Sequence, residues 1–311
     1  MGTYSKKGLI YGFIGTIFVG LQPIVAISRP AMVNAHISAA MTCIVETLIF
    51  LPLMLVEVKR IRKDTQELNE TSYSMLKGWK NNLWLLLFIG IIFGVNQLLF
   101  FVGYDLAEAI NGSLTQKTTV FFSMLLGYLI LKEKITKLQI IFSIVLFLGL
   151  TIAITQFFSL VQFSITILIG VGILLGISFL WMIGHTLTKP IFDRKEATPI
   201  QMVFIRNFLS GIILILTFFI IFPFDYQLFT EPDNILFYFT MGAVYGTGLV
   251  CWYKTLSYLD VSKATILFAP TPIVSAIFAT FILGANFTVF HLIGTILVVI
   301  SIVVLVKKKE T

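Results

Sequence analysis

Three ionisable side chains, Glu46, Lys117 and Arg206, lie within long runs of apolar residues. Charged groups are costly to place among apolar atoms, and those found at such depth usually contact a ligand or an ion path. Glu46 and Lys117 each lie on the order of 12–14 Å from the same end of their predicted helices, at ~1.5 Å per residue. We therefore predict that Lys117 is a fixed positive charge for a carboxylate or phosphate group, with Glu46 as its counter-ion or as a proton carrier.

Each of these charges also has a purely structural interpretation. Glu46 and Lys117 could form a salt bridge that pins two helices together, although buried pairs rarely stabilise a fold. Arg206 lies six residues into its predicted helix, where a long side chain can extend toward lipid headgroups instead of entering a cavity. Both alternatives stay open, while the usual role of intramembrane charges favours binding for Lys117.

Neutral polar and aromatic residues at similar depth form a second group of candidates. A binding cavity needs a few oriented donors and acceptors among apolar walls. The residues predicted to bind a ligand together with Lys117 and Glu46 are Asn96, Gln97, Asn111, Gln116, Trp181, Thr271 and Ser275, and Gln22 and His185 could also face inward. For a single hydroxyl or amide, an interhelical hydrogen bond is the alternative role.

Other polar and aromatic residues are assigned to helix ends and breaks. Pro270 and Pro272 leave backbone carbonyls without donors at membrane depth, so we expect a bend there. Trp252 and Tyr253 are predicted to belong to the aromatic belt at the membrane surface. Two histidines near predicted helix ends, His36 and His291, are predicted to be solvated or interfacial.

The elements that must position these residues follow from the composition. Hydrophobic residues make up 58% of the 311 and charged residues only 12%, more apolar surface than a soluble domain can bury. Apolar runs of about twenty residues suit a hydrocarbon core of ~30 Å. The sequence predicts an all-α integral membrane protein with ten transmembrane helices, at residues 8–27, 37–58, 83–103, 109–131, 138–156, 165–184, 200–222, 235–256, 264–284 and 289–306.

The distribution of basic residues predicts the orientation. Of the 22 Lys and Arg residues, 19 fall on the side of the N-terminus if the ten helices alternate. The positive-inside rule then places both termini in the cytoplasm and the chain, multi-pass, in a plasma or inner membrane. The long charged segment at 59–80 is predicted to be a solvated connector. Basic loops beside an anionic leaflet account for the net charge of +7, so no nucleic-acid partner is expected.

A weak internal repeat divides the chain into two halves. Residues 101–136 align without gaps on residues 253–288, at an offset of 152. We predict one five-helix repeat at 1–157 and a second at 158–311. An odd number of helices per repeat makes the two copies enter the membrane from opposite sides, around a central cavity, a geometry that supports alternating access.

The residues that carry this repeat also resemble a known family. The run YKTLSYLDVSKATILFAPTPIVSAIFATFILG at 253–284 and the weaker LLGYLILKEKIT at 125–136, with Lys132 and Glu133, are similar to EamA-type transporters of the drug/metabolite transporter superfamily. The chain departs from the pattern at Val120, where the second half has Pro272, and at Ala285, where the family often has Glu. The resemblance implies that the first four helices of each half surround the cavity and that the fifth and tenth lie outside it.

We therefore expect a secondary transporter that moves a small polar metabolite by alternating access; the candidates are an amino acid or a similar compound, anionic compounds included. Export is the direction that the resemblance implies. The alternatives are a non-transporting membrane receptor or scaffold and, less in keeping with the residues, an intramembrane enzyme, because no catalytic set is visible. No cofactor or metal is expected, and Cys43 and Cys251 are interpreted as small buried hydrophobes. Proton coupling, sodium coupling and a homodimer are left open.

Overall fold

The structure is a computed structural model that describes residues 3–65, 78–131, 135–156, 164–258, 264 and 267–306. Within these residues the regular secondary structure is helical throughout. The elements are α1 (Thr3–Ile27), α2 (Ala35–Thr65), η1 (Gly78–Asn82), α4 (Leu83–Ala107), α5 (Ala109–Thr115), η2 (Gln116–Thr118), α6 (Thr119–Leu131), α7 (Lys137–Thr155), α8 (Ile165–Asp193), α9 (Pro199–Ile221), α10 (Gln227–Thr230), α11 (Pro232–Tyr258), α13 (Thr271–Leu283) and α14 (Val289–Val306). Lys132, Glu133 and residues 66–77 of the predicted connector lie outside the described residues.

Length and apolar composition identify the chain as a membrane protein. Seven of the described helices are long and apolar enough to cross a membrane, namely α1, α2, α4, α7, α8, α9 and α11. Shorter apolar helices lie at Thr271–Leu283 and Val289–Val304. The predicted fourth helix is divided into α5, η2 and α6. The all-helical membrane class is therefore confirmed, whereas the count of ten spans stays a prediction.

Local sequence signals explain where two of the helices begin. Thr136 precedes α7 and Thr198 precedes α9, and each threonine hydroxyl accepts a hydrogen bond from the backbone N–H three residues on. In turn, Oε1 of Gln139 and Oε1 of Gln201 accept a hydrogen bond from the backbone N–H of the threonine. This reciprocal capping box satisfies donors that a helix start would otherwise leave free.

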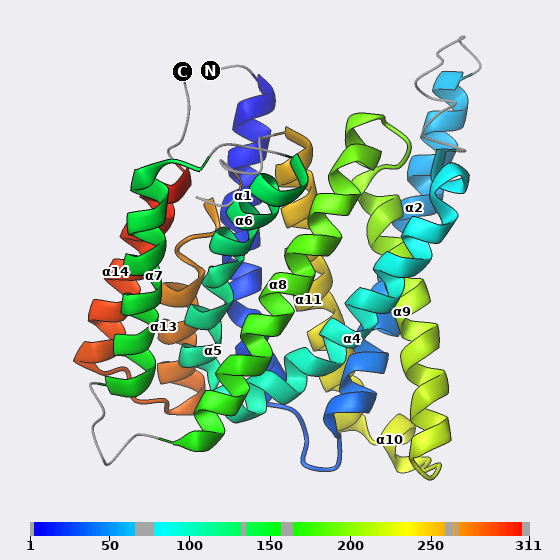
Figure 1. Cartoon of the computed structure of the whole chain (residues 1–311). Helices are drawn as coiled ribbons and strands as arrows, with labels where there is room; N and C mark the ends of the chain where they lie inside the picture. Colours follow the sequence, from blue (N-terminus) through cyan, green and yellow to red (C-terminus); the bar gives the residue numbers. More distant parts are fainter. Residues whose placement is uncertain are drawn as a thin grey trace.

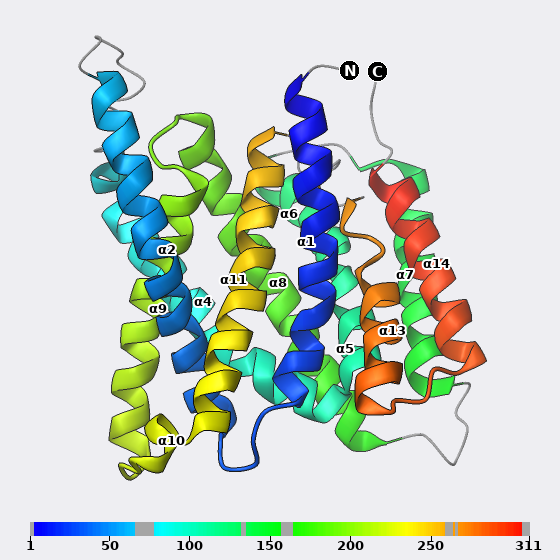
Figure 2. The ribbon, with the colours of Figure 1, turned by 180° about the vertical axis from the view of Figure 1, so that it is seen from behind.

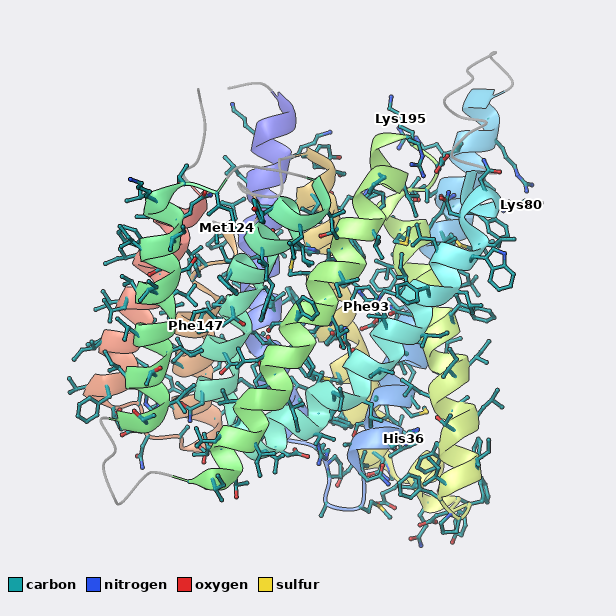
Figure 3. All side chains as sticks on the ribbon, viewed as in Figure 1. His36, Lys80, Phe93, Met124, Phe147 and Lys195 are labelled. Atoms are coloured by element: carbon teal, nitrogen blue, oxygen red, sulfur yellow. The ribbon has the colours of Figure 1, made fainter. Side chains whose placement is uncertain are left out.

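The long helices run side by side along the bundle (Figures 1 and 2). The beginning of α1 and the end of α14 lie at the same end of the bundle, where Figure 3 also places Lys80 and Lys195, while His36 lies toward the opposite end. The main helix pairs are α1 with α11, α2 with α9, α4 with α8 and α7 with α14. The α7–α14 pair forms one side of the bundle and the α2–α9 pair the other, so the helices between them enclose the centre.

Two helix breaks meet at this centre. The 3₁₀ turn η2 interrupts the run from α5 to α6, and a turn at residues 268–270 precedes α13, as the two prolines predict. Pro272 has no N–H, so the carbonyl of Phe268 lacks its usual helical donor. Because α5 packs against α13, the broken segments face each other and bring polar backbone and side-chain groups together.

Two histidines at helix starts are not solvated, contrary to one of the two interpretations offered for them. His36 is 8% exposed, and its Nε2 lies 3.0 Å from both the carbonyl oxygen of Leu214 and Oγ1 of Thr217. His291 is 4% exposed and contacts Asn111. Both residues begin helices in sequence, but tertiary packing covers these helix ends and supplies hydrogen-bond partners in place of water.

Candidate functional site

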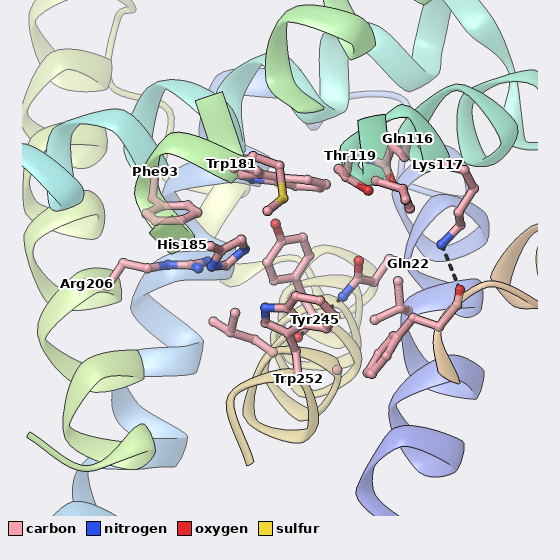
Figure 4. A pocket seen from close by; sticks show the side chains of 16 residues that line it. Gln22, Phe93, Gln116, Lys117, Thr119, Trp181, His185, Arg206, Tyr245 and Trp252 are labelled. Carbon is pink, nitrogen blue, oxygen red and sulfur yellow. Dashed lines mark hydrogen bonds between the residues drawn. The ribbon is translucent and has the colours of Figure 1, made fainter. Parts of the chain in front are cut away.

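A pocket lies at the centre of the bundle, beside the two helix breaks (Figure 4). Its cavity volume is about 120 Å³. Its walls come from α1, α4, η2, α6, α8, α9 and α11 and from Phe268. The polar residues that line it are Gln22, Gln116, Lys117, Thr119, His185 and Arg206, and the aromatic ones are Phe93, Trp181, Tyr245, Trp252 and Phe268.

Lys117 enters the pocket from the 3₁₀ turn η2 and is only 8% exposed. Its Nζ donates a hydrogen bond of 3.0 Å to the carbonyl oxygen of Phe268. That carbonyl also accepts a bond of 2.7 Å from Oγ1 of Thr271. An ammonium carries three N–H donors, so the bond to Phe268 leaves donor capacity for a ligand.

Arg206 enters from α9 and is 3% exposed. Its guanidinium carbon lies 3.9 Å from the ring centroid of Phe93, a cation–π contact. Its Nε is buried without a hydrogen-bond partner. The alternative in which Arg206 extends to the headgroups is therefore wrong, because packing against α4 holds the side chain inside. Figure 4 shows Arg206 and Lys117 on opposite sides of the pocket.

Glu46 lies behind this wall and does not line the pocket. It is 1% exposed on α2, and its Oε2 accepts a short hydrogen bond from the side-chain amide of Asn207. Its Oε1 has no partner. Glu46 is close enough to Arg206 for the two charges to attract. In the described part of the chain Glu46 and Lys117 thus have different partners, and the salt bridge considered between them does not form.

Four buried side-chain nitrogens of the pocket have no hydrogen-bond partner in the described structure; three are donors, and Nδ1 of His185 donates or accepts according to its tautomer. Buried polar atoms are nearly always paired, yet Nε2 of Gln116, Nε1 of Trp252, Nδ1 of His185 and Nε of Arg206 are buried without a partner. All of these residues line the pocket. Unsatisfied groups that converge on one cavity are expected where a ligand completes the hydrogen bonding.

Aromatic rings form a continuous wall between the two cations. At the Arg206 end, the ring centroid of Phe93 lies 5.4 Å from that of His185. The ring centroid of His185 lies 5.7 Å from that of Trp252. Trp252 lies 5.0 Å from Phe268 at an angle of 84°, and the carbonyl of Phe268 holds Lys117. Trp252 was predicted to lie in the surface belt, and so was Tyr253, which is 0% exposed. That prediction is wrong, because α11 is covered by its neighbours at this depth.

Three of the predicted ligand-binding residues, Gln116, Lys117 and Trp181, line the pocket. Several others bond within the protein instead: Asn111 contacts Nε2 of His291 at 3.3 Å, Thr271 caps Phe268, and Ser275 donates to the carbonyl of Gly20 at 2.9 Å. Asn96 and Gln97 are buried in α4 outside the pocket lining, with amide atoms that have no partner. Glu46 lies outside the pocket lining and accepts a hydrogen bond from Asn207.

The sequence carried a signal for pocket residues that the prediction left out. Tyr245, Gly248, Leu249 and Trp252 follow the i, i+3, i+4, i+7 spacing of one helix face, and all line the pocket. Trp181 and His185, which were among the predicted inward-facing residues, lie four positions apart on α8 and so share one face. Small Gly248 allows close approach of α1, because an added Cβ would lie 2.9 Å from Nε2 of Gln22.

Known proteins resemble this chain over almost its full length. The EamA-like transporter family matches residues 6–155 and 163–307. "Uncharacterized transporter YyaM" of Bacillus subtilis (strain 168) is 25% identical over 261 residues, which cover 80% of this chain and 77% of that protein. A crystal structure with 12% sequence identity superposes with a TM-score of 0.68 over 96% of both chains. This last likeness shows the fold alone.

Proposed function

The chain belongs to the EamA-like transporter family, and from that premise we propose that this membrane transporter carries a small polar metabolite by alternating access as a secondary transporter. The observation that carries the proposal is the central pocket with Lys117 and Arg206 on opposite sides. Buried charges of this kind usually serve a substrate path, and here they face an enclosed space.

Inverted halves support the alternating-access part of the proposal. Under the offset of 152, the 3₁₀ turn Gln116–Thr118 corresponds to residues 268–270, the turn before α13. Both helix breaks therefore occupy the same place in the proposed repeats at 1–157 and 158–311. The two stretches that match the family, residues 6–155 and 163–307, have limits similar to those of the two proposed repeats. Broken helices at the interface of inverted repeats are typical of secondary transporter sites.

The residues have distinct roles in this proposal. Lys117 and Gln116 bind an acidic or acceptor group of the metabolite, while Trp181 packs on its body. Glu46 is the counter-ion of Arg206 rather than of Lys117, and it is our candidate for a proton carrier because one carboxylate oxygen has no partner. Ten spans with cytoplasmic termini in a plasma membrane, and export as the direction, belong to the same proposal.

Transport by the purified protein tests this function. Proteoliposomes containing the protein are loaded with a labelled mixture of small organic acids and amino acids, and efflux is compared with protein-free vesicles. We expect efflux that falls at least tenfold in Lys117→Gln and stays unchanged in Lys137→Gln, a matched change at an exposed lysine. Equal efflux from protein-free vesicles, as a receptor, scaffold or enzyme would give, or full activity of Lys117→Gln, contradicts the proposal.

A further inference from the structure

We propose that the substrate is an organic acid with a flat apolar body and no free ammonium group, such as an aromatic or conjugated monocarboxylate. This inference rests on the proposed function and deepens it, since it selects among small polar metabolites. The charges, the unsatisfied donors and the aromatic wall of the pocket each contribute one part of the argument.

The charges exclude a zwitterion. The charged residues that line the pocket are Lys117 and Arg206, and no carboxylate stands among the lining residues that the structure describes. Glu46 does not line the pocket; its carboxylate accepts a hydrogen bond from Asn207 and attracts Arg206. An α-ammonium group would enter a buried space beside two cations without an acidic partner, which costs the full desolvation of its charge. A single carboxylate instead offsets the excess of one positive charge that these three residues leave.

The unsatisfied donors indicate where the carboxylate binds. Lys117 gives one hydrogen bond to Phe268 and has no carboxylate partner in the described structure. The adjacent Gln116 presents a buried Nε2 without a partner. Figure 4 shows both side chains on the same side of the pocket. An ammonium and an amide N–H side by side can serve the two oxygens of one carboxylate, and hydrogen bonds of this charge-assisted kind are the stronger ones.

The aromatic residues indicate the shape of the rest of the molecule. Figure 4 places Trp181 and Trp252 on opposite walls, with Tyr245 between them. Planar rings favour a flat apolar body, which stacks on such walls at little entropic cost. At the far end, Nε of Arg206, Nδ1 of His185 and Nε1 of Trp252 lack partners. The N–H groups of Arg206 and Trp252 suit a neutral acceptor, such as a hydroxyl or carbonyl oxygen, on the ring or chain, and Nδ1 of His185 suits either a donor or an acceptor according to its tautomer.

Binding of matched compounds tests the inference. The full-length protein in lipid nanodiscs is titrated with phenylpyruvate, phenylalanine, phenethylamine and pyruvate. Phenylpyruvate and phenylalanine differ mainly in an oxo against an ammonium group, whereas pyruvate lacks the ring. We expect phenylpyruvate to bind at least tenfold more tightly than each of the other three compounds.

Two variants with matched controls assign the binding to this pocket. Gln116→Leu and Trp252→Leu should each weaken phenylpyruvate binding at least fivefold, and neither removes the Lys117 bond to Phe268. The control Trp84→Leu alters a tryptophan that is 85% exposed and should leave binding unchanged. Lys117→Gln should abolish the preference for the acid, and Lys117→Arg should retain it if Lys117→Gln does not fold.

The outcomes separate this inference from the proposed function. Phenylalanine binding as tightly as phenylpyruvate overturns the exclusion of the ammonium group, and pyruvate binding as tightly overturns the flat apolar body. Failure of all four compounds to bind also overturns the inference. The proposed function is contradicted separately, by the absence of protein-dependent efflux of any labelled metabolite.

Discussion

Nζ of Lys117 donates a hydrogen bond of 3.0 Å to the carbonyl oxygen of Phe268, so a side chain from one helix break caps a backbone carbonyl of the other. Pro272, four residues beyond Phe268, cannot supply the N–H that a continuous helix would. Lys117 therefore has a structural role besides the proposed binding role. The two roles can be separated, because only the structural one can be replaced by a backbone N–H.

Replacement of Lys117 alone and together with Pro272 distinguishes the structural role of Lys117 from its binding role. Lys117→Ala removes one hydrogen bond to the Phe268 carbonyl, which keeps the bond from Oγ1 of Thr271, and should lower the free energy of unfolding by roughly 0.5–1.5 kcal/mol. Lys117→Ala combined with Pro272→Ala returns an N–H to position 272 and should recover much of that loss. Transport should stay absent in the double variant. Thermal unfolding and proteoliposome efflux measure the two effects, and recovered transport would show that Lys117 is only a backbone cap.

Glu46 and Arg206 should be coupled in stability. Arg206→Gln leaves the carboxylate of Glu46 buried with Asn207 and without a nearby cation, at a cost of roughly 1–3 kcal/mol. Glu46→Gln removes that charge, so the double variant should be more stable than Arg206→Gln alone. A double-mutant cycle on unfolding free energies measures the coupling. Additive effects would mean that the two charges do not interact.

The connection between α8 and α9 predicts a pH-dependent contact outside the membrane-spanning segments. Hydrogen bonds of 2.8 Å from Arg194 and Asn82 to Oε2 of Glu196 lower the pKa of this carboxyl below its ordinary value of 4.5. A lowered pKa means that the contact stabilises the folded state above pH 4.5 and that this stability is lost as the pH falls through the folded-state pKa.

The variant Glu196→Gln tests this linkage. At pH 7 it should be less stable than the parent, and the difference should shrink as the pH falls below 4.5, where the parent carboxyl becomes protonated. The difference should also shrink in high salt, because Arg194 is 53% exposed. Unfolding followed by circular dichroism at several pH values measures it. A difference that is constant with pH would contradict the assignment.

The junction of α4 and α5 holds a strained backbone. Glu108 has φ 64° and ψ 167°, a region that is costly for any residue except glycine, by roughly 1–3 kcal/mol. Glu108→Gly should therefore raise the free energy of unfolding by about 1 kcal/mol after the entropy of glycine in the unfolded chain is subtracted. Glu108→Ala keeps the strain and should not. Equal stability of both variants in chemical denaturation would argue against strain at this position.

The α7–α14 pair depends on close backbone contact. A Cβ added at Gly294 would lie 2.5 Å from the carbonyl oxygen of Gly149, so Gly294→Ala must push the two helices apart. A Cβ at Gly172 would meet nothing within 4 Å. Gly172→Ala should stabilise by up to about 1 kcal/mol, while Gly294→Ala should destabilise without changing ligand affinity in the pocket. Thermal unfolding and titration measure both properties, and a loss of affinity in Gly294→Ala would connect the pair to the pocket.

Part of the site could be predicted because depth along a helix can be counted. Lys117, Gln116 and Trp181 were selected as polar or amphipathic residues at mid-helix, and they line the pocket. Arg206 was left open between headgroups and cavity, since its distance from the helix start suits both. Trp252 was misplaced for the same reason: a position near a helix end looks interfacial unless a neighbouring helix covers it.

The sequence by itself determined that this chain is an all-helical membrane protein, because long apolar runs and helix-breaking prolines act locally, and the resemblance of residues 253–284 and 125–136 pointed to the EamA-type family. Only the tertiary structure decided the partners. Glu46 bonds to Asn207 and not to Lys117, and Lys117 bonds to the backbone of Phe268, 151 residues away in the chain. The rotation of each helix about its axis selects which side chains meet, and that rotation depends on packing against all neighbours at once, which no single segment encodes.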